Sequence, residues 1–181
     1  MYEELRRFGK KLVEGGMVSS HSGNMSIRIG DNILITRSGS MLDELTEASI
    51  VEVGFDPSSF DLIASSETIV HRSIYKNTSA LAVIHAHCPF AVILSFLEEG
   101  PIEPMDVEGD YFLHSIPILK CGTGSTELAE DVSSKLTKNK GVIVRGHGTF
   151  AIGKNIEDAY VITSAIEYSC KLRYYYNLAK K

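Results

Sequence analysis

Near the start of the chain, a segment that alternates between apolar and polar residues is followed by a tight turn and a second, mainly apolar segment. Met25–Ile29 and Ile33–Thr36 are separated by residues 30–32 (Gly-Asp-Asn), which are residue types that favour turns. The pattern predicts an antiparallel β-hairpin. A sheet that contains a hairpin is mixed or antiparallel, so a doubly wound parallel sheet is excluded.

Apolar periodicity predicts the other elements. Helices are expected over residues 2–15, 64–76, 89–97, 126–136 and 156–178, with a short one over 46–50. Strands are expected over 51–53, 81–86, 116–119, 142–145 and 149–152. The chain contains no repeat or linker, so we expect a single α/β domain over residues 1–181, with a central mixed, largely antiparallel sheet.

Local signals refine some of these boundaries. Ser65 or Ser66 is expected to cap the second helix, and Asn155 the last one. Pro117 suits an edge strand, because proline cannot donate a hydrogen bond to a neighbouring strand. Residues 98–115 are acidic and are expected to be irregular.

Composition and charge narrow the class of function. The net charge of −5 argues against a general nucleic-acid-binding protein, although a local basic pocket for one phosphate remains compatible with it. Cys88, Cys121 and Cys170 are an odd number without close pairing, which does not indicate a disulfide framework. The N-terminus lacks the apolar core of a signal peptide, and no run is long enough to span a membrane. We therefore expect a reduced, cytoplasmic location.

The apolar run that begins at Leu81 ends in His85 and His87. Residues i and i+2 of a strand project from the same face, so both imidazoles are expected to point into one space. Such a pair is half of a metal site, and the alternative is two ordinary polar residues at a strand end. His147, between two glycines at an expected turn, could complete a site of three imidazoles with an open fourth position, or be an exposed turn histidine.

Glu67 follows two serines at the start of an expected helix. Backbone N–H groups and the helix dipole favour an anion at such a place. The simpler interpretation is a helix-capping glutamate. The more specific one makes Ser65 and Ser66 phosphate donors, and Glu67 an acid/base beside a metal. His71 would share a helix face with Glu67 and is expected to be structural.

Two further loops of small polar residues could hold a phosphate. They contain Gly23-Asn24 and Ser38-Gly39, and they offer N–H, hydroxyl and amide donors. Turns of this composition also occur for geometric reasons alone. Apart from Arg37, these loops contain few lysines or arginines. A phosphate is therefore expected to be held mainly by the dipoles of N–H, hydroxyl and amide groups. His21 and His114 lack ligand-like spacing and are expected at the surface or behind the site.

Five motifs, in order along the chain, resemble the class II aldolase/epimerase family. They are Ser22–Ser26, Thr36–Gly39, Ser65–Glu67, His85–His87 and Gly146–Gly148. Nearly the whole chain fits the family pattern. The resemblance implies a central, largely antiparallel sheet between helical layers, and a homotetramer with active sites at subunit interfaces.

The resemblance also implies roles for individual residues. His85, His87 and His147 would hold a zinc ion, for which another divalent metal could substitute. Glu67 would act as the acid/base, and it could also bind the metal in the apo form. A sugar-phosphate substrate would place its phosphate against Asn24, Ser38, Gly39, Ser65 and Ser66.

The Ser-Ser-Glu motif separates the family's activities. Aldolases carry it where epimerases carry Ser-Ser-Asp, so Glu67 favours a metal-dependent aldolase. Such an enzyme would cleave a short ketose 1-phosphate, such as L-fuculose 1-phosphate, to dihydroxyacetone phosphate and an aldehyde such as lactaldehyde. The alternatives are an L-ribulose-5-phosphate 4-epimerase and a methylthioribulose-1-phosphate dehydratase, which also uses a glutamate here. A non-catalytic scaffold, as in the adducin head, is expected to lose metal ligands that this chain retains.

A second acid/base is expected from a neighbouring subunit. Asp110–Phe112 resembles the segment from which the epimerases supply an aspartate across the interface, so Asp110 and Tyr111 are candidates. Tyr174–Tyr176 are others, although an aromatic end to a packed helix is the favoured explanation for them.

Overall fold

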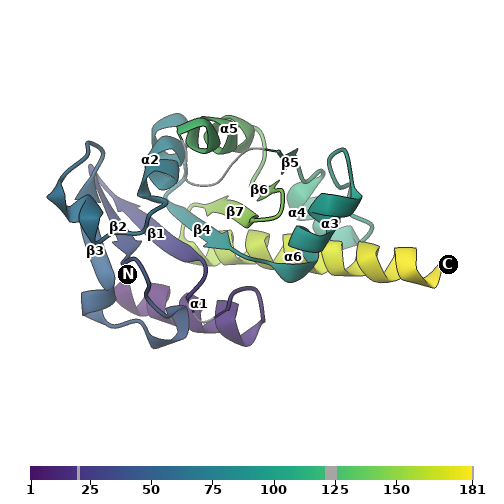
Figure 1. Cartoon of the computed structure of the whole chain (residues 1–181), viewed down its shortest axis with the longest axis horizontal. Helices are drawn as coiled ribbons and strands as arrows, with labels where there is room; N and C mark the ends of the chain where they lie inside the picture. The colour runs from purple at the N-terminus through teal and green to yellow at the C-terminus, as the bar shows by residue number, and fades with distance from the viewer. Residues whose placement is uncertain (20, 121–125, 181) are drawn as a thin grey trace.

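The computed structural model describes residues 1–19, 21–120 and 126–180. The expected Gly-Thr-Gly-Ser loop at 122–125 and Cys121 lie outside these ranges. Figure 1 shows the helices, which are α1 (Tyr2–Glu14), α2 (Thr68–Asn77), α3 (Pro89–Leu97), α4 (Val107–Leu113), α5 (Thr126–Leu136) and α6 (Ile156–Ala179). Three short 3-10 helices are η1 (Leu42–Glu44), η2 (Glu47–Ser49) and η3 (Ser59–Leu62).

Seven strands form one mixed sheet. They are β1 (Asn24–Ile29), β2 (Asn32–Thr36), β3 (Ile50–Gly54), β4 (Ala82–Ala86), β5 (Ile118–Leu119), β6 (Gly141–Val144) and β7 (Gly148–Gly153). Their order across the sheet is β3-β2-β1-β4-β7-β6-β5, and all neighbours are antiparallel except β5 and β6. The predicted fold class and the β1–β2 hairpin are confirmed. Pro117 directly precedes the edge strand β5, as predicted.

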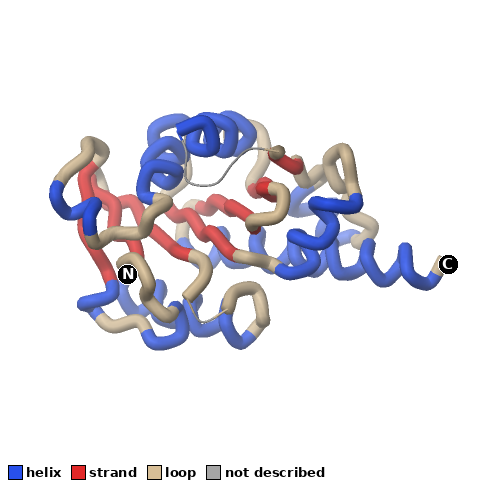
Figure 2. The backbone as a smooth tube through the Cα atoms, in the orientation of Figure 1, coloured by secondary structure: helices blue, strands red, loops and turns tan. Residues whose placement is uncertain are grey.

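Helices cover both faces of the sheet. Figures 1 and 2 show α1 and α6 along one face and the paired helices α2 and α5 along the other. Each face has its own apolar core, with Leu5, Phe8 and Ile166 in one and Ile74 and Val132 in the other. Because β4 lies at the centre of this sandwich, its five residues are all buried.

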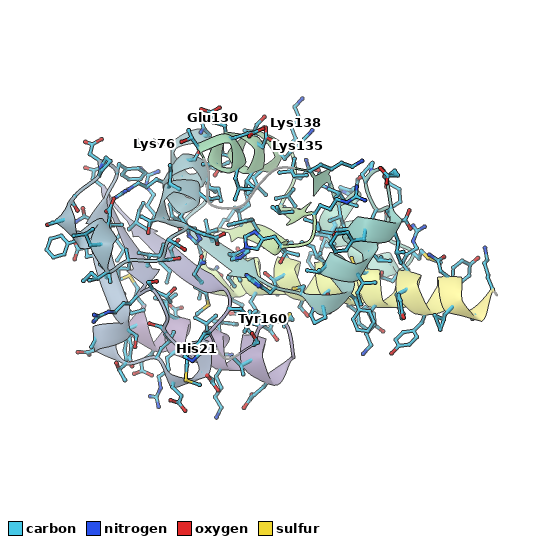
Figure 3. All side chains as sticks on the ribbon, viewed as in Figure 1. His21, Lys76, Glu130, Lys135, Lys138 and Tyr160 are labelled. Atoms are coloured by element: carbon cyan, nitrogen blue, oxygen red, sulfur yellow. The ribbon has the colours of Figure 1, made fainter. Side chains whose placement is uncertain are left out.

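The solvent sides of the helices are charged. Figure 3 shows Lys76, Glu130, Lys135 and Lys138 on the outer side of the α2–α5 layer. Helix α1 has the same division, since it buries Leu5, Phe8 and Leu12 and exposes Glu3, Arg6 and Lys10. Within the described residues, no helix combines the length and apolar character that crossing a membrane requires.

Some local boundaries differ from the prediction; for example, the strand expected over 116–119 is only Ile118–Leu119. Helix α2 begins at Thr68 with Glu67 at the cap position, so neither Ser65 nor Ser66 is its N-cap; the Ser65 hydroxyl instead accepts a hydrogen bond of 3.3 Å from the Glu67 N–H. Residues 107–113 form α4, whose cap is Asp106, although 98–115 were expected to be irregular. The expected helix over 46–50 is the single 3-10 turn η2. The Asn155 cap of α6 is confirmed by its contact with the Asp158 N–H.

Candidate functional site

Three histidines meet at one end of the central strands. His85 lies on β4, His87 follows it by two residues, and His147 occupies the tight turn between β6 and β7. One nitrogen from each ring lies within 4.8 Å of the other two. The Nε2 atoms of His85 and His87 are 2.9 Å apart. The structure therefore brings together the three imidazoles that the sequence singled out.

The turn at His147 depends on its glycines. Gly146 has φ +69°, a left-handed conformation that L side chains rarely adopt. A Cβ at Gly148 would lie 2.3 Å from the backbone oxygen of Ala86, so only glycine allows β7 to approach β4 this closely. The two glycines thus hold the His147 imidazole beside the end of β4.

Burial keeps the three imidazoles neutral. Desolvation is the main cause of a lowered pKa for each: His85 falls well below its ordinary value, His87 is lowered, and His147 is lowered to about 4. Nδ1 of His85 lies 3.0 Å from the Thr149 carbonyl oxygen, so this nitrogen carries the proton and donates. The Nε2 lone pair of His85 therefore points into the site.

A buried carboxylate lies among the histidines. Glu67 is only 7% exposed, and its oxygens lie 3.2 Å from Nε2 of His85 and 3.5 Å from Nε2 of His147. Desolvation raises the pKa of Glu67, and the hydrogen bond that it accepts from the Asn24 amide opposes this rise. Since the imidazoles are neutral, these contacts are not ion pairs.

The donor set fits a divalent metal ion. Zinc is bound in proteins by neutral imidazole nitrogens and carboxylate oxygens, and three histidines leave a coordination position for a substrate. Two buried acceptor or donor atoms near this group, Oδ1 of Asn24 and Nδ1 of His147, have no partner among the described residues. Both observations indicate a site built for a divalent ion and a ligand.

A cleft of about 230 Å³ opens in front of the histidines. It is lined by Glu67, by the three predicted metal ligands and by all five predicted phosphate-binding residues. His21, Ser22, Gly23, Arg37 and Ser40 also line it. His21, labelled in Figure 3 on the segment between α1 and β1, is exposed, as expected, and it also lines the cleft. Its Nδ1 lies 3.1 Å from the Gly39 carbonyl oxygen and joins the two loops. The only feature of the sequence that pointed to a position of His21 near the cleft was its place three residues before Asn24.

Other candidates lie outside the cleft. Asp110 and Tyr111 are exposed on α4, with Tyr111 72% accessible, and neither lines the cleft of its own chain. His71 is fully buried below the cleft and, as predicted, makes structural contacts. The rings of Tyr174 and Tyr175 pack on Phe90, with centroids 5.6 and 5.7 Å away, which favours the packing interpretation for these two tyrosines.

The fold and the cleft together define an α/β protein with a metal-competent, histidine-rich site. The family described as Class II Aldolase and Adducin N-terminal domain matches residues 3–174, and the chain belongs to this family. Class II aldolases depend on a metal ion, and membership indicates a lyase-like enzyme.

Individual relatives are similar over nearly their whole length. An L-fuculose phosphate aldolase of Methanocaldococcus jannaschii is 32% identical over 174 residues, which is 95% of this chain and 94% of the relative. The crystal structure of L-fuculose-1-phosphate aldolase from Thermus thermophilus superposes with a TM-score of 0.93 at 33% identity, covering 99% of this chain and 95% of that one. A methylthioribulose-1-phosphate dehydratase of Gluconobacter oxydans is 30% identical over 183 residues, covering 91% of this chain and 87% of the relative.

Proposed function

We propose that this protein is a zinc-dependent aldolase that cleaves a short ketose 1-phosphate, resembling L-fuculose 1-phosphate, to dihydroxyacetone phosphate and an aldehyde such as lactaldehyde. The observation that carries the proposal is the position of Glu67, whose carboxylate lies 3.2 and 3.5 Å from two of the three histidines. A proton-transfer group and a metal-ligand set thus face the same small cleft.

The histidines would hold the ion, and Glu67 would move the proton. A divalent cation held by His85, His87 and His147 would supply Lewis-acid stabilisation of the negative charge that develops on the ketose oxygens. Glu67 would donate a proton to C3 of the three-carbon fragment after the C3–C4 bond breaks, and would remove it in the reverse direction. Burial raises the pKa of Glu67, which favours a carboxyl group that can both donate and accept a proton.

The loops at the mouth of the cleft would orient the substrate. Ser38, Gly39, Ser65 and Ser66 line the same cleft as the histidines, and Asn24 lies beside Glu67. A phosphate fixed there would hold C3 near the Glu67 carboxylate, which supplies orientation rather than chemistry.

A neighbouring subunit would complete the site. We propose a homotetramer in the cytoplasm, in which Asp110 or Tyr111 of an adjacent subunit exchanges the proton on the aldehyde oxygen. Both residues are exposed on α4, where a neighbouring subunit can reach them. Tyr111→Phe should lower kcat without changing the mass of the assembly in solution. An unchanged kcat for both Tyr111→Phe and Asp110→Asn would exclude this role.

A dehydratase is the second candidate. The similarity to the Gluconobacter oxydans dehydratase favours it, because elimination of water from methylthioribulose 1-phosphate also needs a base beside a polarised ketone. An epimerase acting on L-ribulose 5-phosphate is a third candidate and has less support, since Glu67 stands where epimerases carry aspartate.

One assay separates these candidates. The zinc-loaded protein is incubated with dihydroxyacetone phosphate and a panel of aldehydes, and separately with methylthioribulose 1-phosphate and L-ribulose 5-phosphate. We expect a ketose 1-phosphate from the first mixture, and its loss in Glu67→Gln. Glu130→Gln, an exposed substitution on α5, is the matched control. Absence of any ketose phosphate, or full activity of Glu67→Gln, contradicts the aldolase proposal.

A further inference from the structure

Arg37 differs from every other arginine in the chain. The sequence contains seven arginines, and all of them lie in described residues. Six contact a carboxylate, a backbone oxygen or an aromatic ring: Arg6, Arg7, Arg28, Arg72, Arg145 and Arg173. Across the part of the chain that the structure describes, the Arg37 guanidinium has no such partner, and it lines the cleft.

The backbone of Arg37 is nevertheless held firmly. Its N–H donates to the Ser49 carbonyl oxygen over 2.8 Å, and it forms an isolated antiparallel bridge with Ala64. A tight turn follows, in which Gly39 has φ +73° and the Ser40 N–H donates to the Arg37 carbonyl. A fixed backbone that carries an unpaired guanidinium at the rim of a cleft indicates a group reserved for a ligand.

The neighbouring backbone donors are largely used within the protein. In the two loops that meet at the cleft, four N–H groups already donate to carbonyl oxygens: those of Arg37, Ser38, Ser40 and Ser65. The N–H of Glu67 also donates, to the Ser65 hydroxyl. A phosphate in this cleft can therefore draw on fewer backbone dipoles than the sequence suggested, and a charged side chain would strengthen its binding.

The charges that line the cleft favour an anion at Arg37. Glu67 is the one carboxylate among the lining residues that the structure describes, and it is buried against the histidines. Arg37 is the one lysine or arginine among the described residues that line the cleft. Arg37 therefore supplies the fixed positive charge at the cleft mouth in a chain whose net charge is −5.

We propose that Arg37 is a specificity-determining residue that selects phosphorylated over unphosphorylated substrates. Its guanidinium binds the phosphate dianion with charge-assisted, bidentate hydrogen bonds. The inference rests on the proposed function for the nature of the substrate, and it adds a charged contact to a subsite that was expected to act through dipoles.

Calorimetric binding to the metal-loaded full chain tests this assignment. The ligands are dihydroxyacetone phosphate and inorganic phosphate, titrated at about 50 mM and 500 mM NaCl, where screening lengths differ several-fold. We expect Arg37→Gln to weaken both ligands by about 10- to 100-fold at low salt, the usual range for a hydrogen bond to a charged group. Arg37→Lys keeps the charge without the bidentate geometry, so its loss should be intermediate.

Arg6→Gln is the matched control, because it removes the same charge from the exposed side of α1. It should bind as the wild type does, and all variants should keep the wild-type thermal midpoint, since both side chains are exposed. The assignment is overturned if Arg37→Gln binds within about twofold of the wild type, or if Arg6→Gln loses as much affinity as Arg37→Gln. It is also overturned if the wild-type protein binds neither phosphate compound. A wild-type protein that binds them through Arg37 but cleaves no ketose 1-phosphate refutes the proposed function and leaves the assignment standing.

Discussion

Asn24 donates a hydrogen bond of 2.9 Å from its Nδ2 atom to Oε2 of Glu67, and both residues are buried. The contact is the first of a row of side-chain hydrogen bonds between β1 and the segment that begins α2. One turn further along α2, Nδ1 of His71 lies 2.6 Å from the Ser26 hydroxyl, which is also 2.7 Å from the Tyr75 hydroxyl. Asn24 and Ser26 of β1 thus contact three side chains spaced four residues apart at the start of α2 and along it, which fixes the carboxylate relative to the sheet.

Asn24→Ala should lower kcat more than it raises KM. The Asn24 amide orients the Glu67 carboxylate, so its removal costs about 10-fold in proton transfer, the lower end for a hydrogen bond to a charged group. Steady-state cleavage kinetics separate this role from the predicted phosphate contact of Asn24. A KM increase with an unchanged kcat would show that the amide acts on the phosphate instead.

His147→Ala should abolish tight metal binding. Removing a residue that only hydrogen-bonds to a metal ligand usually lowers metal affinity by about 10- to 100-fold. Loss of one of the three ligands themselves should therefore weaken metal binding by more than about 100-fold. Elemental analysis after dialysis measures the bound ion. His114→Asn is the control, because His114 is exposed and its φ of 53° suits asparagine. Equal metal content in the two variants would contradict the three-histidine site.

His71 should make stability fall in mild acid. Burial lowers the pKa of His71 in the folded chain to about 3, whereas an unfolded histidine titrates near 6.5. Between these values the unfolded chain binds the additional proton, so the free energy of unfolding decreases as pH falls from about 6.5 towards 3, by about 1.4 kcal/mol per unit from this group. Above about 6.5 the group contributes no pH dependence.

Urea unfolding of the metal-free protein at several pH values measures this slope. His71→Asn removes the titrating group, so its free energy of unfolding should depend less steeply on pH than that of the wild type. Other buried histidines contribute equally to both proteins and cancel in the comparison. Identical slopes would show that His71 does not titrate as its burial requires.

Gly9→Ala should destabilise the fold even though alanine is the better helix former. A Cβ at Gly9 would lie 2.2 Å from the backbone oxygen of Leu42, so α1 must move away from η1, at a cost of about 1–3 kcal/mol. Gly54→Ala meets no atom within 4 Å and should change stability by less than about 0.5 kcal/mol. Chemical unfolding compares the two, and a Gly9→Ala protein as stable as Gly54→Ala would contradict the close contact.

Much of the fold follows from local sequence patterns. The alternation in Met25–Ile29 predicts the hairpin, and the apolar run before His85 predicts a strand buried between two layers, because both patterns depend on neighbours close in sequence. Helix α4 was missed because glycine and nearby prolines hide its pattern; Gly109 is required there, since a Cβ would lie 2.3 Å from the Ser169 hydroxyl.

The residues of the site could be predicted from the sequence only where they belong to one short motif. His85 and His87 share a strand face, so their convergence follows from spacing. The approach of His21 to Gly39, and the unpaired state of Arg37, depend on how loops distant in sequence meet in the folded chain. The start of α2 at Thr68 was missed because Ser65 bonds to the Glu67 N–H before the helix begins.

Proton exchange at carbon reports directly on Glu67 as the acid/base. Dihydroxyacetone phosphate is incubated with the zinc-loaded enzyme in D2O without any aldehyde, and the C3 protons are followed by NMR. The proposed mechanism predicts that the wild type exchanges a single C3 proton, and that the rate is about 10²- to 10⁴-fold lower in Glu67→Gln, the usual contribution of a general acid/base. Exchange at the wild-type rate in Glu67→Gln, with metal and phosphate binding intact, would contradict it.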